Sequence, residues 1–161
     1  MKNCFLILVF IVIQGTFAQT KTTTYYFIRH AEKADDSKNP NLSPKGIERA
    51  TLWSKIFSDI NFDAVYSTDF NRTIQTATPV VTNKHLAITI YNPKTIDFQE
   101  FKKETLGKII LIVGHSNSTP EFVNKIINQI VYPTIEDSTF GNLYIVIIKG
   151  DFITYQLLKL P

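Results

Sequence analysis

Short apolar runs that alternate with helix-like segments constrain the fold of this chain more than any other feature. Residues 22–28 are β-branched or aromatic almost without a break, as in a strand that is covered on both faces. Residues 62–67, 87–91 and 108–113 show the same character. Because helical segments separate these strands, the sequence predicts an α/β domain with a mostly parallel sheet.

The helix signals lie between the strands. Ser43 is a typical N-cap residue, Pro44 suits the first helical position, and a helix is expected to follow to about Ser58. Its apolar positions lie at helical spacing and are Ile47, Ala50, Trp53 or Ser54, and Phe57. This spacing predicts that Trp53 belongs to the core.

Three further helices are expected over residues 69–80, 97–105 and 119–130. The last of them has the spacing of a packed helix at Phe122, Ile126, Ile127 and Ile130.

The C-terminal part of the chain reads as a hairpin. Residues 143–148 and 152–158 form two strands joined by a turn at Gly150-Asp151. The predicted fold is therefore a three-layer α/β sandwich: a mostly parallel central sheet, helices on both faces, and a C-terminal antiparallel hairpin at the edge. A single domain over residues 19–161 is expected.

Residues 1–18 have the features of a cleaved signal peptide. Lys2 precedes an apolar run over residues 5–13, and small residues stand at positions −3 and −1 of a cut after Ala18. The run is shorter than the roughly 20 residues that span a bilayer, so export to the periplasm or the exterior is expected, with no membrane anchor after cleavage. Cys4 lies in the leader, which excludes disulfides and thiol catalysis in the mature chain.

Charge gives no sign of a nucleic-acid partner. The formal net charge is +3, and removal of the leader takes away Lys2 and no acidic residue, which leaves +2. The lysines are scattered along the chain and not clustered.

Polar motifs follow three of the predicted strands. Arg29-His30, residues 67–72 and His115 all come where a strand ends. In open parallel sheets, ligands bind beyond the carboxyl ends of the strands. The three motifs are therefore expected to meet in one pocket.

The residue types of these motifs suit a phosphate ligand. Arg29 offers a fork of fixed positive charge beside the imidazole of His30, and Arg72 lies near the start of a helix, where the dipole favours anions. A surface salt bridge from Arg72 to Asp69 or Glu100 is the alternative.

A metal site is the alternative for the histidines. His85 lies in a polar stretch, and no carboxylate falls at ligand spacing with the three histidines, so no metal is expected.

Four motifs resemble those of the histidine phosphatase superfamily, the phosphoglycerate-mutase-like family, and in particular its small phosphohistidine-phosphatase-like members. They are residues 27–33 (FIRHAEK), 42–50 (LSPKGIERA), 66–77 (YSTDFNRTIQTA) and 113–117 (VGHSN). The resemblance spans the mature chain. It implies a phosphoglycerate-mutase-like fold and a hydrolase that forms a phosphohistidine intermediate, without metal or other cofactor.

The resemblance also implies the roles of single residues. His30 takes the phosphoryl group, Arg29 and Arg72 hold its oxygens, and His115 supplies a further charged or hydrogen-bonding group. Asn117 is expected to contribute to substrate binding. The substrate is expected to be a small phosphorylated metabolite or a phosphoprotein.

The chain departs from the family pattern at Ala31, where many members have glycine, although this small residue should keep the turn. The general acid is not fixed by the sequence. Glu32, Asp97, Glu100 and Glu121 are all possible, and a phosphoramidate substrate would need no strong acid. Glu121 is carried forward as the candidate because it lies one helical turn past His115.

The short spacing between Arg72 and His115, about forty residues, leaves no room for a large lid. The pocket should therefore be open, which favours a phosphatase over a mutase.

Two other functions are compatible with parts of the pattern. A serine hydrolase would use Ser116, but serine stands where its nucleophile motif needs a second glycine. A noncatalytic module that binds phosphorylated ligands would use the same pocket. His30 favours the enzyme, because a receptor gains little from a nucleophile between two arginines.

Overall fold

The computed structural model describes residues 20–160, so the expected signal peptide lies outside the described residues. Within that range, none of the helices has the length and apolar character needed to cross a membrane. The elements in chain order are β1 (Thr22–Arg29), α1 (Pro44–Ile56), β2 (Ala64–Ser67), α2 (Asn71–Lys84), β3 (Ile88–Ile90), α3 (Phe98–Glu104), β4 (Ile109–Gly114), α4 (Ser118–Ile127), β5 (Asn142–Lys149) and β6 (Phe152–Lys159).

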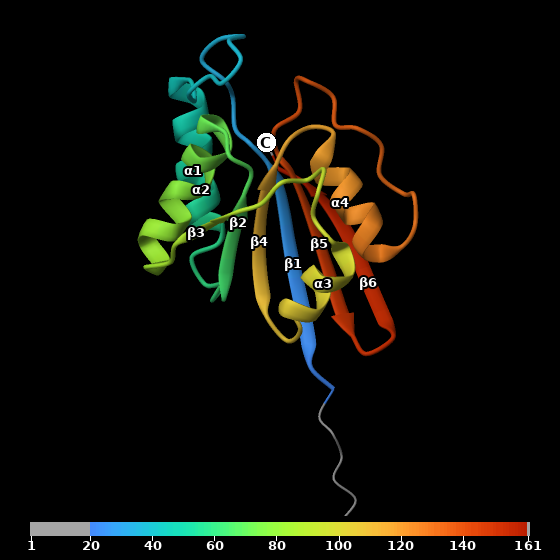
Figure 1. Cartoon of the computed structure of the whole chain (residues 1–161). Helices are drawn as coiled ribbons and strands as arrows, with labels where there is room; N and C mark the ends of the chain where they lie inside the picture. Colours follow the sequence, from blue (N-terminus) through green and yellow to red (C-terminus); the bar gives the residue numbers. More distant parts are fainter. Residues whose placement is uncertain (1–19, 161) are drawn as a thin grey trace, which may run out of the picture.

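The strands form one six-stranded sheet in the order β3-β2-β4-β1-β5-β6. The first four strands in this order are parallel, whereas β5 and β6 form the expected antiparallel hairpin at one edge (Figure 1). The predicted mixed α/β fold is confirmed. The parallel pairing aligns Arg29 of β1 with Gly114 of β4, and Ser67 of β2 with Val113. The three polar motifs therefore begin side by side.

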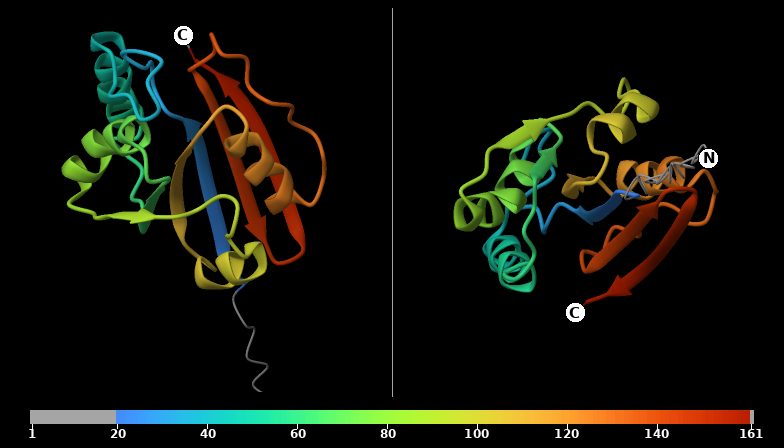
Figure 2. Two further views of the ribbon diagram at one scale, coloured as in Figure 1. Left: turned by 45° about the horizontal axis from the view of Figure 1, so that its top comes forward. Right: turned by 90° about the horizontal axis from the view of Figure 1, so that it is seen from below.

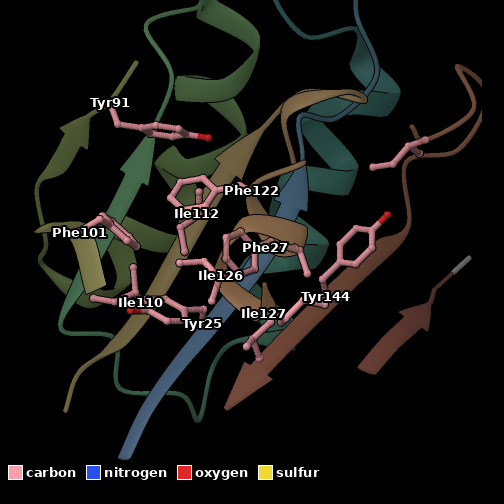
Figure 3. Close-up of a cluster of buried hydrophobic side chains, with 13 residues drawn as sticks. Tyr25, Phe27, Tyr91, Phe101, Ile110, Ile112, Phe122, Ile126, Ile127 and Tyr144 are labelled. Atoms are coloured by element: carbon pink, nitrogen blue, oxygen red, sulfur yellow. The ribbon is translucent and has the colours of Figure 1, made fainter. Parts of the chain in front are cut away.

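Helices cover both faces of the sheet (Figures 1 and 2). Side chains on the strands alternate between the two faces. On β4, Ile110 and Ile112 pack toward α3 and α4, whereas Leu111 and Val113 pack toward α1 and α2. Figure 3 shows the first of these two cores, in which Phe122 of α4 lies over the sheet. Two cores on one sheet explain the unbroken apolar character of the central strands.

The helix that starts at Pro44 follows the sequence pattern with one exception. Ser43 caps it as predicted and accepts a hydrogen bond from the Gly46 amide, and Trp53 is buried. Ile47 was expected on the packed face but is 57% exposed. The inward position belongs to Gly46, where a Cβ atom would lie only 2.2 Å from the carbonyl oxygen of Glu32. The close approach of α1 to this backbone rotates Ile47 outward.

The expected continuation of α4 to residue 130 is wrong. The helix ends at Ile127, because Asn128 adopts the left-handed conformation that terminates helices. The side-chain oxygen of Asn124 then accepts hydrogen bonds from the amides of Val131 and Tyr132, which turns the chain away. Ile130 is 99% exposed and takes no part in the core.

Candidate functional site

The carboxyl ends of β1, β2 and β4 open into a cleft of about 1500 Å³. The six residues that the sequence indicates as catalytic or substrate-binding all line it: Arg29, His30, Arg72, His115, Asn117 and Glu121. They come from three separate segments, at the end of β1, at the start of α2 and where β4 leads into α4, and the parallel register of β1 with β4 brings the two histidines together. Their ring centroids are 5.5 Å apart.

His30 is held with one ring nitrogen available for reaction. It follows the last residue of β1 and is 4% exposed. Its Nδ1 lies 2.7 Å from the carbonyl oxygen of Ala31, which can only accept, so Nδ1 carries the proton and Nε2 has a free lone pair. The Ala31 amide donates to the Thr76 hydroxyl at 2.9 Å, which ties this turn to α2. Ala31 is not among the residues with positive φ, so the turn does not require glycine.

The same surroundings keep His30 uncharged. Burial lowers the pKa of its imidazole to about 3, and the charges of Arg29 and Arg72 act in the same direction. The hydrogen bond to Ala31 opposes this shift but is outweighed. At neutral pH the ring is therefore an unprotonated nucleophile.

His115 is fixed by hydrogen bonds at both ring nitrogens. Arg72 Nη2 lies 3.3 Å from its Nδ1, and Thr68 Oγ1 lies 2.9 Å from its Nε2. A guanidinium group can only donate, so Nδ1 accepts and Nε2–H donates to Thr68. The Thr68 hydroxyl donates in turn to Thr73 Oγ1 at 3.0 Å. Burial, followed by the charges of Arg72 and Arg29, lowers the pKa of His115 to about 4, so the free site presents a neutral hydrogen-bonding group.

Gly114 allows His115 to sit against the start of α4. A Cβ atom at this position would lie 2.7 Å from Thr119 Oγ1 and 3.0 Å from the hydroxyl oxygen of Tyr91. Figure 3 shows Tyr91 extending from the end of β3 with its hydroxyl directed toward the end of β4. A side chain at residue 114 would therefore displace the strand end that carries the histidine.

Arg29 does more than the sequence indicates. Its Nη1 donates to the carbonyl oxygens of Glu136, Asp137 and Thr139 at 2.9, 3.1 and 3.0 Å. Its guanidinium carbon lies 4.4 Å from the centre of the Phe140 ring. The arginine thus fastens the segment before β5 beside the cleft, and its Nη2 lies 3.5 Å from a carboxylate oxygen of Asp137, which also lines the cleft. No sequence signal marked this segment, because its bonds to Arg29 run through backbone carbonyls.

Arg72 is held more loosely. Its guanidinium carbon lies 4.5 Å from the centre of the Phe70 ring, and Nη2 contacts His115. In the part of the chain that the structure describes, Arg72 makes no salt bridge to Asp69 or Glu100, which was the alternative role. Most of its donors are therefore free for a ligand.

Only one of the four carboxylates considered as the general acid lines the cleft. Burial acts to raise the pKa of Glu32, but hydrogen bonds from Arg49 at 2.9 to 3.0 Å outweigh it and leave this pKa below its ordinary value. Asp97 caps α3 by accepting from the amides of Gln99 and Glu100. Glu100 itself pairs with Lys103 at 3.4 Å. Glu121 faces the cleft from α4.

One further carboxylate reaches the cleft without a partner arginine. Asp69 follows Thr68 directly in the third motif and lines the cleft, although the sequence indicated it only as a possible salt-bridge partner of Arg72. Its exposure at the cleft makes it the natural comparison for Glu121. Among residues 20–160, no group of three or more His, Cys, Asp or Glu side chains is placed to hold a metal ion.

Comparisons with known proteins support the resemblance over the first three motifs. A model of the histidine phosphatase superfamily (branch 1) matches residues 25–93, which include the first three motifs. No curated protein matches the sequence significantly.

Solved structures share the fold at low sequence identity. A putative alpha-ribazole-5'-P phosphatase from Escherichia coli has a TM-score of 0.64 at 16% identity, over 86% of this chain and 96% of that one. A phosphoglycerate mutase from Bacillus anthracis gives 0.67 at 14%, over 87% and 94%. The putative phosphohistidine phosphatase SixA from Agrobacterium tumefaciens gives 0.61 at 15%, over 86% and 99%. Together, the matched model and the shared fold confirm the resemblance of this chain to the histidine phosphatase superfamily.

Proposed function

We propose that this protein is a metal-independent phosphatase that forms a phosphohistidine on Nε2 of His30. The observation that carries this proposal is the hydrogen bond from Nδ1 of His30 to the Ala31 carbonyl, which leaves Nε2 unprotonated in a cleft with two arginines. The superfamily match and the phosphatases among the structural neighbours support phosphatase activity. The substrate is a phosphomonoester or a phosphoramidate.

In the first step, the Nε2 lone pair attacks phosphorus and the bond from phosphorus to the leaving oxygen or nitrogen breaks. The leaving atom keeps the bonding electrons and takes a proton from an acid. The ring of the phosphorylated histidine is positively charged, and its Nδ1–H remains bonded to Ala31 O, which stabilises that charge. In the second step, water attacks phosphorus and gives a proton back to the conjugate base of that acid, the bond from phosphorus to Nε2 breaks, phosphate departs, and Nε2 regains its lone pair.

Fixed positive charge serves the transferring phosphoryl group. Arg72 and Arg29 line the cleft, and their positive charges stabilise the oxygens over which transition-state charge is spread. His115 adds a hydrogen bond, and an arriving dianion favours its protonated form. This supply of charge by side chains supports a reaction without a metal ion.

Glu121 is the acid of this proposal, since it faces the cleft one turn into α4.

A noncatalytic phosphate-binding module is the alternative function that the sequence pattern also allows. That function gains nothing from a desolvated histidine whose tautomer is set for attack, so the geometry favours the enzyme.

The test is hydrolysis of p-nitrophenyl phosphate in EDTA from pH 4 to 9, with vanadate as inhibitor. We expect vanadate-sensitive, EDTA-resistant turnover that His30→Asn abolishes. His85→Asn is the matched control, because His85 lies at the end of α2, outside the cleft, and asparagine tolerates its left-handed backbone. When the reaction with a phosphohistidine peptide or a ³²P-labelled ester as substrate is quenched rapidly, an acid-labile phosphate should be found on His30. Turnover that survives in His30→Asn contradicts the mechanism.

Export is a separate part of the proposal. We propose that residues 1–18 direct the chain across a membrane and are then removed. N-terminal sequencing of the protein from its native source tests this, and a mature chain that keeps Lys2 contradicts it.

A further inference from the structure

The cleft holds the whole cationic excess of the chain. Of the 17 lysines and arginines and 14 aspartates and glutamates in the sequence, six and three line the cleft. The cleft therefore carries a formal net charge of +3, whereas the rest of the chain without the leader and its Lys2 carries −1. Such a concentration of one sign of charge raises the local concentration of anionic ligands.

The phosphoryl site accounts for only part of this charge. Arg29 and Arg72 stand beside the histidines, and Lys33 pairs with Asp36 at 2.9 Å. The other three lysines that line the cleft are Lys38, Lys94 and Lys125. Within residues 20–160 their ammonium groups form no ion pair.

The three lysines come from three walls of the cleft, and the backbone of each wall is held in place. Lys38 lies in the loop before α1, where the Asn71 amide donates to Asn39 Oδ1 at 2.8 Å. The backbone amide of Lys94 donates to Asn92 Oδ1 at 3.0 Å, in the loop between β3 and α3. These bonds fix where the side chains start.

Lys125 and Lys94 are on neighbouring walls. Lys125 lies on α4, one turn beyond Glu121. The Phe98 ring at the start of α3 packs on Phe122 of α4, with ring centroids 5.0 Å apart. The loop that carries Lys94 is thereby fastened against α4, and both lysines face the same open space.

This space exceeds what a phosphoryl group needs. The cleft of about 1500 Å³ is larger than the roughly 300–1,000 Å³ of ordinary small-molecule sites. An uncharged leaving group would gain nothing from three free ammonium groups, whereas a second anion would. Building on the proposed phosphatase, we propose that the preferred substrate carries a second anionic group, a carboxylate or phosphate, which Lys38, Lys94 and Lys125 bind.

The test compares two esters that differ in one group. Glycerol 3-phosphate and 3-phosphoglycerate each carry the phosphoryl group, but only the second has a carboxylate. We expect kcat/KM to be about tenfold higher for 3-phosphoglycerate, because exposed ion pairs between its carboxylate and these lysines are together worth about a factor of ten. The ratio should fall as salt rises from 0.05 to 1 M, because the Debye length shortens to about 3 Å and exposed charges are then screened from one another.

Substitution locates the effect. The triple variant Lys38→Gln, Lys94→Gln, Lys125→Gln should bring the ratio close to one. The matched control replaces Lys55, Lys108 and Lys149 by glutamine, three exposed lysines outside the cleft, and should keep the ratio. A preference that the cleft triple variant retains in full overturns the proposal.

A binding measurement separates this inference from the proposed activity. Calorimetry with the His30→Asn variant gives the affinities of both esters without turnover, and tighter binding of 3-phosphoglycerate that depends on the cleft lysines supports the inference even if hydrolysis fails. Two phosphopeptides with glutamates or glutamines beside the phosphorylated residue identify the source of the second anion. A preference in either pair supports the proposal, and no preference in both overturns it.

Discussion

The hydroxyl oxygen of Thr68 lies 2.9 Å from Nε2 of His115, and this bond orients the second histidine of the cleft. Thr68 is 1% exposed and also bonds Thr73, so its hydroxyl links the ring to the start of α2. Thr68→Val keeps the shape but leaves Nε2–H without an acceptor. We expect kcat/KM to fall about tenfold, in line with loss of one buried hydrogen bond.

Thr68→Ser is the control, because it restores the hydroxyl and should recover most of the activity. The ¹⁵N shifts of the His115 ring report its tautomer, and a purely structural role for Thr68 would leave them unchanged. Wild-type kinetics and wild-type ring shifts in the valine variant would argue against a positioning role.

The pH dependence of activity follows from the lowered pKa values of the two histidines. Burial lowers the pKa to about 3 for His30 and about 4 for His115. The nucleophile therefore stays unprotonated at pH 5, where an ordinary histidine is mostly charged. We expect the acid limb of kcat/KM for the free enzyme, corrected for ionisation of the substrate phosphate, to appear only below about pH 4.5. An acid limb centred near pH 6.5 would contradict this.

Stability should depend on pH for the same reason. Between the unfolded pKa of about 6.5 and the folded values, the unfolded chain binds protons at both histidines and the folded chain does not. The free energy of unfolding is therefore highest above pH 6.5 and falls as pH drops, by at most about 1.4 kcal/mol per pH unit for each histidine. Urea unfolding at pH 7, 6 and 5 measures the slope. His30→Gln should make it shallower, and an equal slope in this variant would count against the prediction.

The two arginines of the cleft should separate in their effects. Arg29→Lys removes a fork that bonds three carbonyls of residues 136–139, and we expect a loss of about 2 kcal/mol in unfolding free energy as well as activity. Arg72→Lys removes a longer contact to His115 from a half-buried side chain. It should cost roughly 100-fold in kcat/KM with little change in stability. Urea midpoints and kinetics of both variants check this, and equal stability losses would refute the distinction.

Local sequence signals predicted the elements that place the site. Unbroken apolar strands, the Ser43-Pro44 cap and the Gly150-Asp151 turn each act over a few residues, so their reading needs no knowledge of the rest of the fold. Parallel pairing then brings His30 and His115 together without further information, because both follow strand ends.

The features that the sequence did not predict depend on contacts between distant segments. Ile47 turns outward because Gly46 packs on the backbone of Glu32. Helical spacing depends on the residues of the helix alone, so it cannot indicate this contact. Arg29 reaches carbonyl groups 107 to 110 residues away, and carbonyls carry no sequence signature. The choice of the general acid among four carboxylates likewise depends on a distant contact, the hydrogen bonds that Arg49 donates to the Glu32 carboxylate.

That choice leads to a prediction about Glu121. A general acid contributes most when the leaving group is poor, because such a group needs a proton in order to depart. Glu121→Gln should therefore slow hydrolysis of glycerol 3-phosphate at least about 100-fold and hydrolysis of p-nitrophenyl phosphate much less. Glu100→Gln, on the exposed surface of α3, is the matched control and should leave the ratio of the two rates unchanged. Asp69→Asn tests the other carboxylate that lines the cleft. If the leaving-group dependence appears in Asp69→Asn and not in Glu121→Gln, the proton comes from the start of α2 and the role of α4 is confined to binding.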